Sequence, residues 1–161
     1  KQGNWEKAEN LYREVMEEYP ETVSAMKIPL VLSEHYTGTE DSEKADEIYS
    51  EALQNYQQLM SDESLPLKVK DTAFDLSTLI YAQQENWNQI ISEMNDLIND
   101  PAVSKAKQSR ALFISASIYQ TKLNNPEKAR ELYQRFLDQF PQHPFRQVVQ
   151  NQMKKIMIPE E

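Results

Sequence analysis

Few side chains in this sequence are of the types that catalyse reactions or bind metal ions. It contains two histidines, His35 and His143, which lie far apart in the chain, and no cysteine. A metal site needs several ligands at matched spacing, and a thiolate site or cysteine nucleophile needs a cysteine. We therefore expect both histidines to be structural or exposed to solvent, and we expect no metal site and no cofactor.

Carboxylates are the most abundant candidate groups, with 26 acidic residues against 17 basic ones. Adjacent pairs include Glu17-Glu18, Glu40-Asp41, Asp46-Glu47 and Asp62-Glu63. Paired carboxylates can act in general acid–base catalysis, but on amphipathic helices such pairs usually form the solvated side. The sequence also has no glycine-rich phosphate loop and no G-x-S-x-G elbow. We therefore expect that the protein is not an enzyme.

The charge limits the classes of partner. A formal net charge of −9 argues against nucleic acid, whose phosphates require a basic surface. No apolar run approaches the roughly 18 residues of a membrane span. The acidic stretch 40–63 is either a solvated surface or a patch for a basic partner. The stretch 146–155 has three bases and no acid, and is either a solubilising end helix or a self-association contact.

The spacing of apolar residues is helical almost throughout. With only two glycines and many good helix formers, the sequence predicts helices joined by short turns. Pro126 follows Asn125, and proline is favoured at the first helical position. Pro29 either kinks the second helix or marks its first turn. The predicted helices span 4–19, 22–36, 42–60, 67–84, 87–99, 103–123, 126–140 and 144–157.

One spacing recurs along the chain at a period near 40 residues. Its instances are Ala8–Tyr12–Val15–Pro20, Ala45–Tyr49–Ala52, Ile90–Met94–Leu97 and Ala129–Tyr133–Phe136–Pro141. Such self-similarity is typical of stacked repeats. We expect an all-α fold, an α-solenoid of antiparallel helix hairpins in a single domain, 1–161, with units 1–20, 22–60, 66–100 and 102–141 and an end helix at 144–157. Gly3-Asn4 is interpreted as the turn of a hairpin whose first helix would precede Lys1, so we expect part of a longer protein.

These segments resemble the tetratricopeptide repeat family, whose 34-residue units carry a W…LG…Y…A…F…A…P pattern. The second-helix slots of the pattern match Ala8, Tyr12, Val15 and Pro20, and again Ala129, Tyr133, Phe136 and Pro141. Leu32, Ser33 and Tyr36 stand at the L-G-x-x-Y part of the second unit. The equivalent residues Ala8, Ala45, Ile90 and Ala129 are 37, 45 and 39 residues apart rather than 34, so the array is irregular.

The resemblance implies a scaffold that binds a partner protein or peptide in a groove lined by the first helix of each unit. The groove-facing slots fall on Lys27, Val31, Glu34, Thr72, Asp75, Leu76, Leu79, Ser115 and Ile118. The alternative for Leu76 and Leu79 is a place in the core. One subgroup of the family binds acidic C-terminal tails through Lys, Asn and Arg side chains in these slots. Of the residues named here only Lys27 fits that pattern, so we do not expect binding of this kind.

The segment 129–141, an A-x-x-x-Y helix that ends in Phe140-Pro141, also resembles bacterial cell-envelope members of the family. It favours a bacterial periplasmic or outer-membrane-associated complex. A cytoplasmic adaptor or regulatory domain, or an accessory domain of a larger enzyme, is the alternative.

Overall fold

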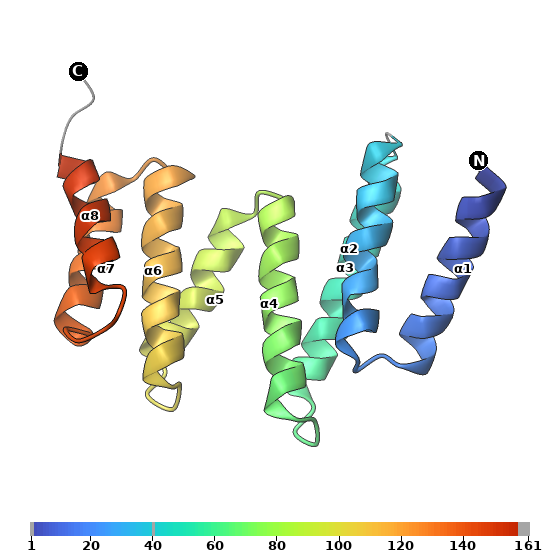
Figure 1. Cartoon of the computed structure of the whole chain (residues 1–161), viewed down its shortest axis with the longest axis horizontal. Coiled ribbons are helices and arrows are strands. Elements are labelled where there is room, and N and C mark those ends of the chain that lie inside the picture. Colours follow the sequence, from blue (N-terminus) through green and yellow to red (C-terminus); the bar gives the residue numbers. More distant parts are fainter. Residues whose placement is uncertain (1, 40, 158–161) are drawn as a thin grey trace. The chain divides into compact units, whose positions relative to one another are not determined.

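The computed structural model describes residues 2–39 and 41–157, and within them it contains helices and no strand (Figure 1). The helices are α1 Gln2–Glu18, α2 Val23–Gly38, α3 Ser42–Ser61, α4 Leu67–Gln83, α5 Trp87–Asn99, α6 Lys105–Thr121, α7 Pro126–Gln139 and α8 Arg146–Met157. This confirms the predicted all-α helical repeat.

The ends of several helices differ from the prediction. Gly3 and Asn4 lie inside α1, so their interpretation as a hairpin turn was wrong. Helix α2 continues through Gly38, two residues beyond the predicted end at Tyr36. Helix α6 is shorter at both ends than the predicted 103–123, and α8 begins at Arg146 rather than Pro144. The predicted tail, 158–161, lies outside the described residues.

Polar side chains before the helices fix most of the observed starts. Thr22, Asp41, Ser104 and Asn125 each accept a hydrogen bond from the backbone N–H three residues later. An N-cap of this kind satisfies one of the donors that the first turn leaves without a partner. The cap before α3 is Asp41, and the helix begins at Ser42, the predicted first residue. Pro126 stands at the start of α7, as predicted.

The chain divides into two compact units, 1–84 and 85–161, which we call unit 1 and unit 2. Unit 1 holds α1–α4 and unit 2 holds α5–α8. The boundary falls between the two helices of the predicted repeat 66–100, and the repeat boundaries stay predictions. The negative charge is concentrated in unit 1, which carries 17 of the 26 acidic residues.

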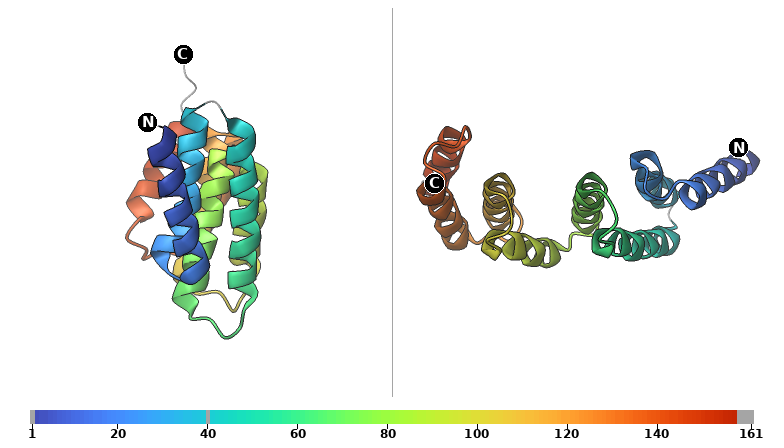
Figure 2. Two further views of the ribbon diagram at one scale, coloured as in Figure 1. Left: turned by 90° about the vertical axis from the view of Figure 1, so that its right-hand side faces the viewer. Right: turned by 90° about the horizontal axis from the view of Figure 1, so that it is seen from below.

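In unit 1, α2 and α3 approach each other at small residues. They overlap in Figure 1 and separate in the turned view of Figure 2. Ser33 and Ala45 are buried at this crossing, and the Ser33 hydroxyl lies 3.4 Å from the Ala45 carbonyl oxygen. Because small side chains let the two backbones come close, Tyr56 of α3 reaches α2 and donates to the carbonyl of Met26.

Pro29 lies inside α2, in its second turn rather than its first. It cannot donate to the carbonyl four residues earlier, yet the helix continues to Gly38, and the Pro29 side chain is buried. The buried residues of unit 1 pack together in core clusters. One comprises Met26, Ala52, Tyr56, Leu59, Ala73, Leu76 and Ile80, and the other Ile28, Leu32, Tyr36, Ala45 and Ile48.

The core of unit 2 is built around α6 and α7. Ala111, Leu112 and Ala116 of α6 and the repeat residues of α7 are almost completely buried. The Tyr133 hydroxyl donates to Gln120 Oε1 at 3.0 Å, which joins the two helices across their contact. Helix α8 covers the other side of α7 with Val149 and Met153.

We predict that Ala129→Leu lowers the free energy of unfolding by roughly 1–3 kcal/mol, because Ala129 has no exposed surface and a larger side chain would overpack the helices. Urea denaturation followed by circular dichroism measures the change. The control is Arg130→Leu at the exposed neighbouring position, where we expect less than about 0.5 kcal/mol. An unchanged denaturation midpoint for Ala129→Leu would contradict the close approach.

Candidate binding site

Three of the predicted binding residues lie on the exposed side of α2. Lys27, Val31 and Glu34 follow the i, i+4, i+7 spacing that places side chains on one side of a helix. All three are exposed, and Val31 keeps 41% of its surface open to solvent. An exposed valine between two charges offers an apolar contact at the surface.

Helix α4, which packs beside α2 in unit 1, contributes the next predicted residues. Asp75 and Leu79 are exposed, with 43% of Leu79 open to solvent, and Thr72 is half-buried. The Thr72 hydroxyl donates to the Lys68 carbonyl oxygen at 2.8 Å. We call the surface made by Lys27, Val31, Glu34, Thr72, Asp75 and Leu79 the α2–α4 face.

Leu76 does not belong to this face. It is 5% exposed and lies in the core cluster with Ala73 and Ile80. These residues are three and four positions apart, and that spacing places them on the inner side of α4. The structure therefore gives Leu76 the core position and leaves Leu79, three residues later, at the surface.

The remaining predicted residues, Ser115 and Ile118, belong to α6 in unit 2. Both are buried, and Ser115 has no exposed surface. Its Oγ atom has no hydrogen-bond partner in the structure. Neither side chain is open to a ligand in unit 2 as folded, so the α2–α4 face is the part of the predicted groove that solvent reaches.

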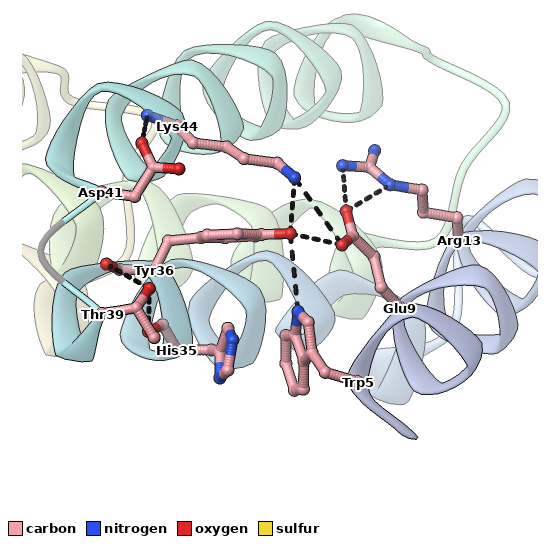
Figure 3. Close-up of polar contacts among 8 residues, drawn as sticks. All are labelled: Trp5, Glu9, Arg13, His35, Tyr36, Thr39, Asp41 and Lys44. Atoms are coloured by element: carbon pink, nitrogen blue, oxygen red, sulfur yellow. Dashed lines mark hydrogen bonds and ion pairs between the residues drawn. The ribbon is translucent and has the colours of Figure 1, made fainter. Parts of the chain in front are cut away.

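A polar cluster that the sequence analysis did not predict joins α1 to the α2–α3 hairpin (Figure 3). At its centre, Glu9 of α1 accepts two hydrogen bonds from the Arg13 guanidinium at 2.8 and 3.0 Å, and a third from the Tyr36 hydroxyl. The Lys44 ammonium lies 3.8 Å from Glu9 and donates to the Tyr36 oxygen at 2.5 Å. One carboxylate thus connects three helices.

Aromatic contacts continue the cluster along α1. The Trp5 ring stacks on His35 with centroids 3.6 Å apart, and its indole N–H donates to the Tyr36 hydroxyl at 3.5 Å. The Lys44 ammonium also lies 4.1 Å from the centre of the Tyr36 ring, a cation–π contact. The sequence offered one local signal of this cluster: Glu9 and Arg13 stand four residues apart on one helix.

The cluster keeps Glu9 ionised. Burial favours the neutral acid, but hydrogen bonds from Tyr36 and Arg13 and the charges of Lys44 and Arg13 outweigh it, so the pKa of Glu9 lies below its usual value. The hydrogen bond to Tyr36 and the Glu9 charge raise the pKa of Lys44. Hydrogen bonds to an ionised carboxylate are stronger than those between neutral groups, so the contacts of Glu9 help to hold α1 in place.

His143, the other histidine, joins α6 to the turn before α8. Its Nδ1 accepts from the Phe145 N–H at 3.1 Å, so a neutral ring carries its proton on Nε2, which lies 3.3 Å from Ser109 Oγ. The Ser109 hydroxyl in turn donates to the Ala106 carbonyl at 2.9 Å. A serine nucleophile would need to give its proton to the histidine, and here that proton points to the backbone. The contact joins the turn before α8 to α6, and the absence of a catalytic role for either histidine stays a prediction.

Among the described residues, no group of three or more histidine and acidic side chains is placed to hold a metal ion. None of the described helices combines the length and apolar character that a membrane crossing requires.

Comparison with known proteins gives one match. The family model of the tetratricopeptide repeat matches residues 1–22 and 110–143. The first segment covers α1 and the turn after it, and the second covers most of α6 with the whole of α7. No curated protein and no solved structure matches the chain.

We predict that Tyr36→Phe lowers the free energy of unfolding by about 1–2 kcal/mol, because Glu9 then loses a hydrogen bond and Lys44 loses an acceptor. Thermal unfolding followed by circular dichroism measures the effect. The matched control is Tyr19→Phe, which removes the hydroxyl of a tyrosine that is 55% exposed. Equal effects of the two substitutions would contradict the role of the cluster.

The lowered pKa of Glu9 also predicts a pH dependence. Its pKa is lower in the folded chain than the usual glutamic acid value of 4.5, so its contribution to stability is present above about pH 4.5 and is lost as the pH falls through the folded-state pKa. The stability difference between the natural chain and Glu9→Gln should be about 1 kcal/mol near neutral pH and shrink in acid. Glu6→Gln, at an exposed position of α1, is the control. A difference that stays constant with pH would refute the assignment.

Proposed function

Since this chain is a tetratricopeptide repeat protein, and such repeats generally mediate protein–protein interaction, we propose that it binds a partner protein or peptide through the α2–α4 face. The proposed activity is binding without catalysis. The observation that carries it is the pair of apolar side chains, Val31 and Leu79, which remain more than one-third exposed on two helices packed side by side.

The composition of the face supports a peptide with apolar anchors. Val31 and Leu79 offer places for one or two apolar side chains, and Lys27, Glu34 and Asp75 provide charges of both signs around them. In protein interfaces a few central apolar contacts supply most of the affinity, while polar groups at the rim set orientation. Helical peptides that lie in a groove are anchored in this way at i, i+3, i+4 and i+7.

We also propose that the protein works in a bacterial cell-envelope complex, in the periplasm or at the outer membrane. The support is the resemblance of segment 129–141, where an A-x-x-x-Y helix ends in Phe140-Pro141. A cytoplasmic adaptor is the alternative. Fractionation of bacterial cells that carry the protein, with immunodetection in periplasmic, membrane and cytoplasmic fractions, distinguishes the two.

We predict that Val31→Glu combined with Leu79→Glu abolishes peptide binding and leaves the fold intact, because both side chains are already exposed. Peptides selected from a random phage-displayed library on the natural chain serve as probes, and calorimetry measures their affinity for each variant. The expected loss is at least tenfold, which corresponds to about 1.4 kcal/mol.

The control is Leu67→Glu, which places the same charge at an apolar residue of α4 that is 66% exposed and lies outside the α2–α4 face. Selected peptides should bind this variant as they bind the natural chain. If they bind the double variant with unchanged affinity while circular dichroism shows the same helicity, the α2–α4 face is not the binding site.

A further inference from the structure

Two helices of unit 2 carry only positive charge in a chain that is acidic overall. Helices α6 and α8 contain three basic residues each and no acidic residue. By contrast, α5 contains two acidic residues and no basic one, and α7 contains three of each sign. The formal net charge of the whole chain is −9. The positive charge of unit 2 is therefore concentrated on α6 and α8.

An aromatic side chain at the start of α8 is held in place and is also open to solvent. The Phe145 ring centroid lies 6.2 Å from that of Phe113 in α6 and 5.6 Å from that of His143. The Phe145 backbone N–H donates to His143 Nδ1 at 3.1 Å, yet 53% of the residue is exposed. Val148, three residues later, is 43% exposed. An exposed ring that is already ordered suits the anchoring of a partner side chain, because little conformational freedom is lost on binding.

This open surface continues along α8 and onto α6. Four residues from Phe145 to Lys155 follow i, i+3, i+7, i+10 spacing, which places them on one side of α8. Phe113 meets that side from α6, and Arg110 stands one turn before Phe113. In Figure 1, α8 lies in front of α7 and α6 stands next to both. We call this surface the α6–α8 face, and its residues are Arg110, Phe113, Phe145, Val148, Gln152 and Lys155.

The open side of α8 occupies the same repeat position as the open side of α2. The repeat spacing aligns Pro141 with Pro20. The open residues of α8 then fall on the α2 residues of the α2–α4 face: Val148 on Lys27, Gln152 on Val31 and Lys155 on Glu34. Although α1, α3 and α4 all pack against α2, that side of α2 stays exposed. Exposure of this side is thus a property of the repeat position, and it does not require the absence of a neighbouring helix.

The charges of the α6–α8 face flank its apolar side chains. Helices α6 and α8 run in the same direction in Figure 1, so Arg110 lies toward one end of the face and Lys155 toward the other. Phe145 and Val148 lie between these ends. Lys155 stands where α2 has Glu34, so the two faces differ in charge at an equivalent position. A partner carboxylate on either side of an apolar anchor would meet a positive charge here.

The anions that a basic surface attracts include nucleic-acid phosphates as well as carboxylates. Nucleic acids bind through several phosphate contacts at once. The exposed acidic residues of α7, which are Glu127, Glu131 and Asp138, and the net charge of −9 oppose the approach of a polyanion. A short peptide segment with a few carboxylates needs only local complementarity. The charges therefore favour an acidic peptide over nucleic acid.

We propose that the α6–α8 face binds an acidic peptide segment of a partner protein. An aromatic or aliphatic side chain of this segment contacts Phe113, Phe145 and Val148, and carboxylates on either side of it lie near Arg110 and Lys155. The apolar contacts supply most of the affinity, and the charges set the specificity and the rate of association. The face lies wholly within unit 2, so the proposal does not depend on peptide binding at the α2–α4 face.

Peptides selected on the natural chain from a random phage-displayed library are the probes. Each is tested again on Val148→Glu, and on Val31→Glu combined with Leu79→Glu. Peptides that bind the α6–α8 face should fail on the first variant and still bind the second. Their sequences should carry Asp or Glu on both sides of an aromatic or aliphatic residue. Peptides that fail only on the second variant report the α2–α4 face, so the two proposals can fail separately.

Point variants then test the charge. Fluorescence anisotropy measures the affinity of one selected, fluorescein-labelled peptide in roughly 0.15 M salt, where charges interact over about 8 Å. Lys155→Glu, which copies the equivalent residue of α2, should weaken binding at least about fivefold. The matched control is Lys154→Glu, the same change at an exposed neighbour outside the face, which should weaken binding less than about twofold. Gln152→Glu keeps the size of the side chain and should weaken binding as Lys155→Glu does.

Three results would overturn the proposal. If no selected peptide fails on Val148→Glu or Gln152→Glu alone, the α6–α8 face is not a docking surface. Equal effects of Lys155→Glu and Lys154→Glu would exclude the charge contact at Lys155. Displacement of the peptide by single-stranded RNA of equal length at equal concentration would assign the face to nucleic acid instead. Circular dichroism of each variant confirms that the chain is folded, so that loss of binding is not loss of structure.

Discussion

The structure depends on how closely neighbouring helices approach at small residues. Ser33 and Ala45 in unit 1, and Ala129 in unit 2, leave room for one backbone to lie against the next helix. Long side chains then reach across the contact. Tyr56 bonds a backbone carbonyl of α2, and Tyr133 bonds a side chain of α6. Each helix buries its apolar side chains against the helices next to it, so the stability of one helix depends on its neighbours.

The sequence predicted the helices well, because the signals for their ends are local. N-cap side chains such as Thr22 and Asn125 act within three residues, and the apolar spacing is visible over each helix. The errors occurred at helix ends, where residues typical of a turn did not stop the helix. Gly3 and Asn4 resemble a turn locally, yet they continue α1, and Tyr36 does not end α2 although a glycine follows two residues later.

The candidate site was harder to predict because its exposure depends on contacts between helices. Spacing shows which residues share a side of a helix, but it does not show which side a neighbouring helix covers. Leu76 and Leu79 are three residues apart on α4, and the first is in the core while the second is at the surface. The polar cluster was missed because Glu9, Tyr36 and Lys44 come from three helices and meet only after folding. That the chain performs no catalysis stays a prediction.

The one-sided attachment of α1 has a consequence for how the molecule opens. Helix α7 buries side chains against both α6 and α8, whereas α1 buries one side and is held in large part by hydrogen bonds and an ion pair. Detachment of α1 therefore exposes less apolar surface than detachment of α7 would. Urea sensitivity and heat capacity both scale with the surface exposed. Hydrogen exchange of the α1 amides should thus proceed by a local opening that depends only weakly on denaturant, while the amides of α7 exchange through larger unfolding.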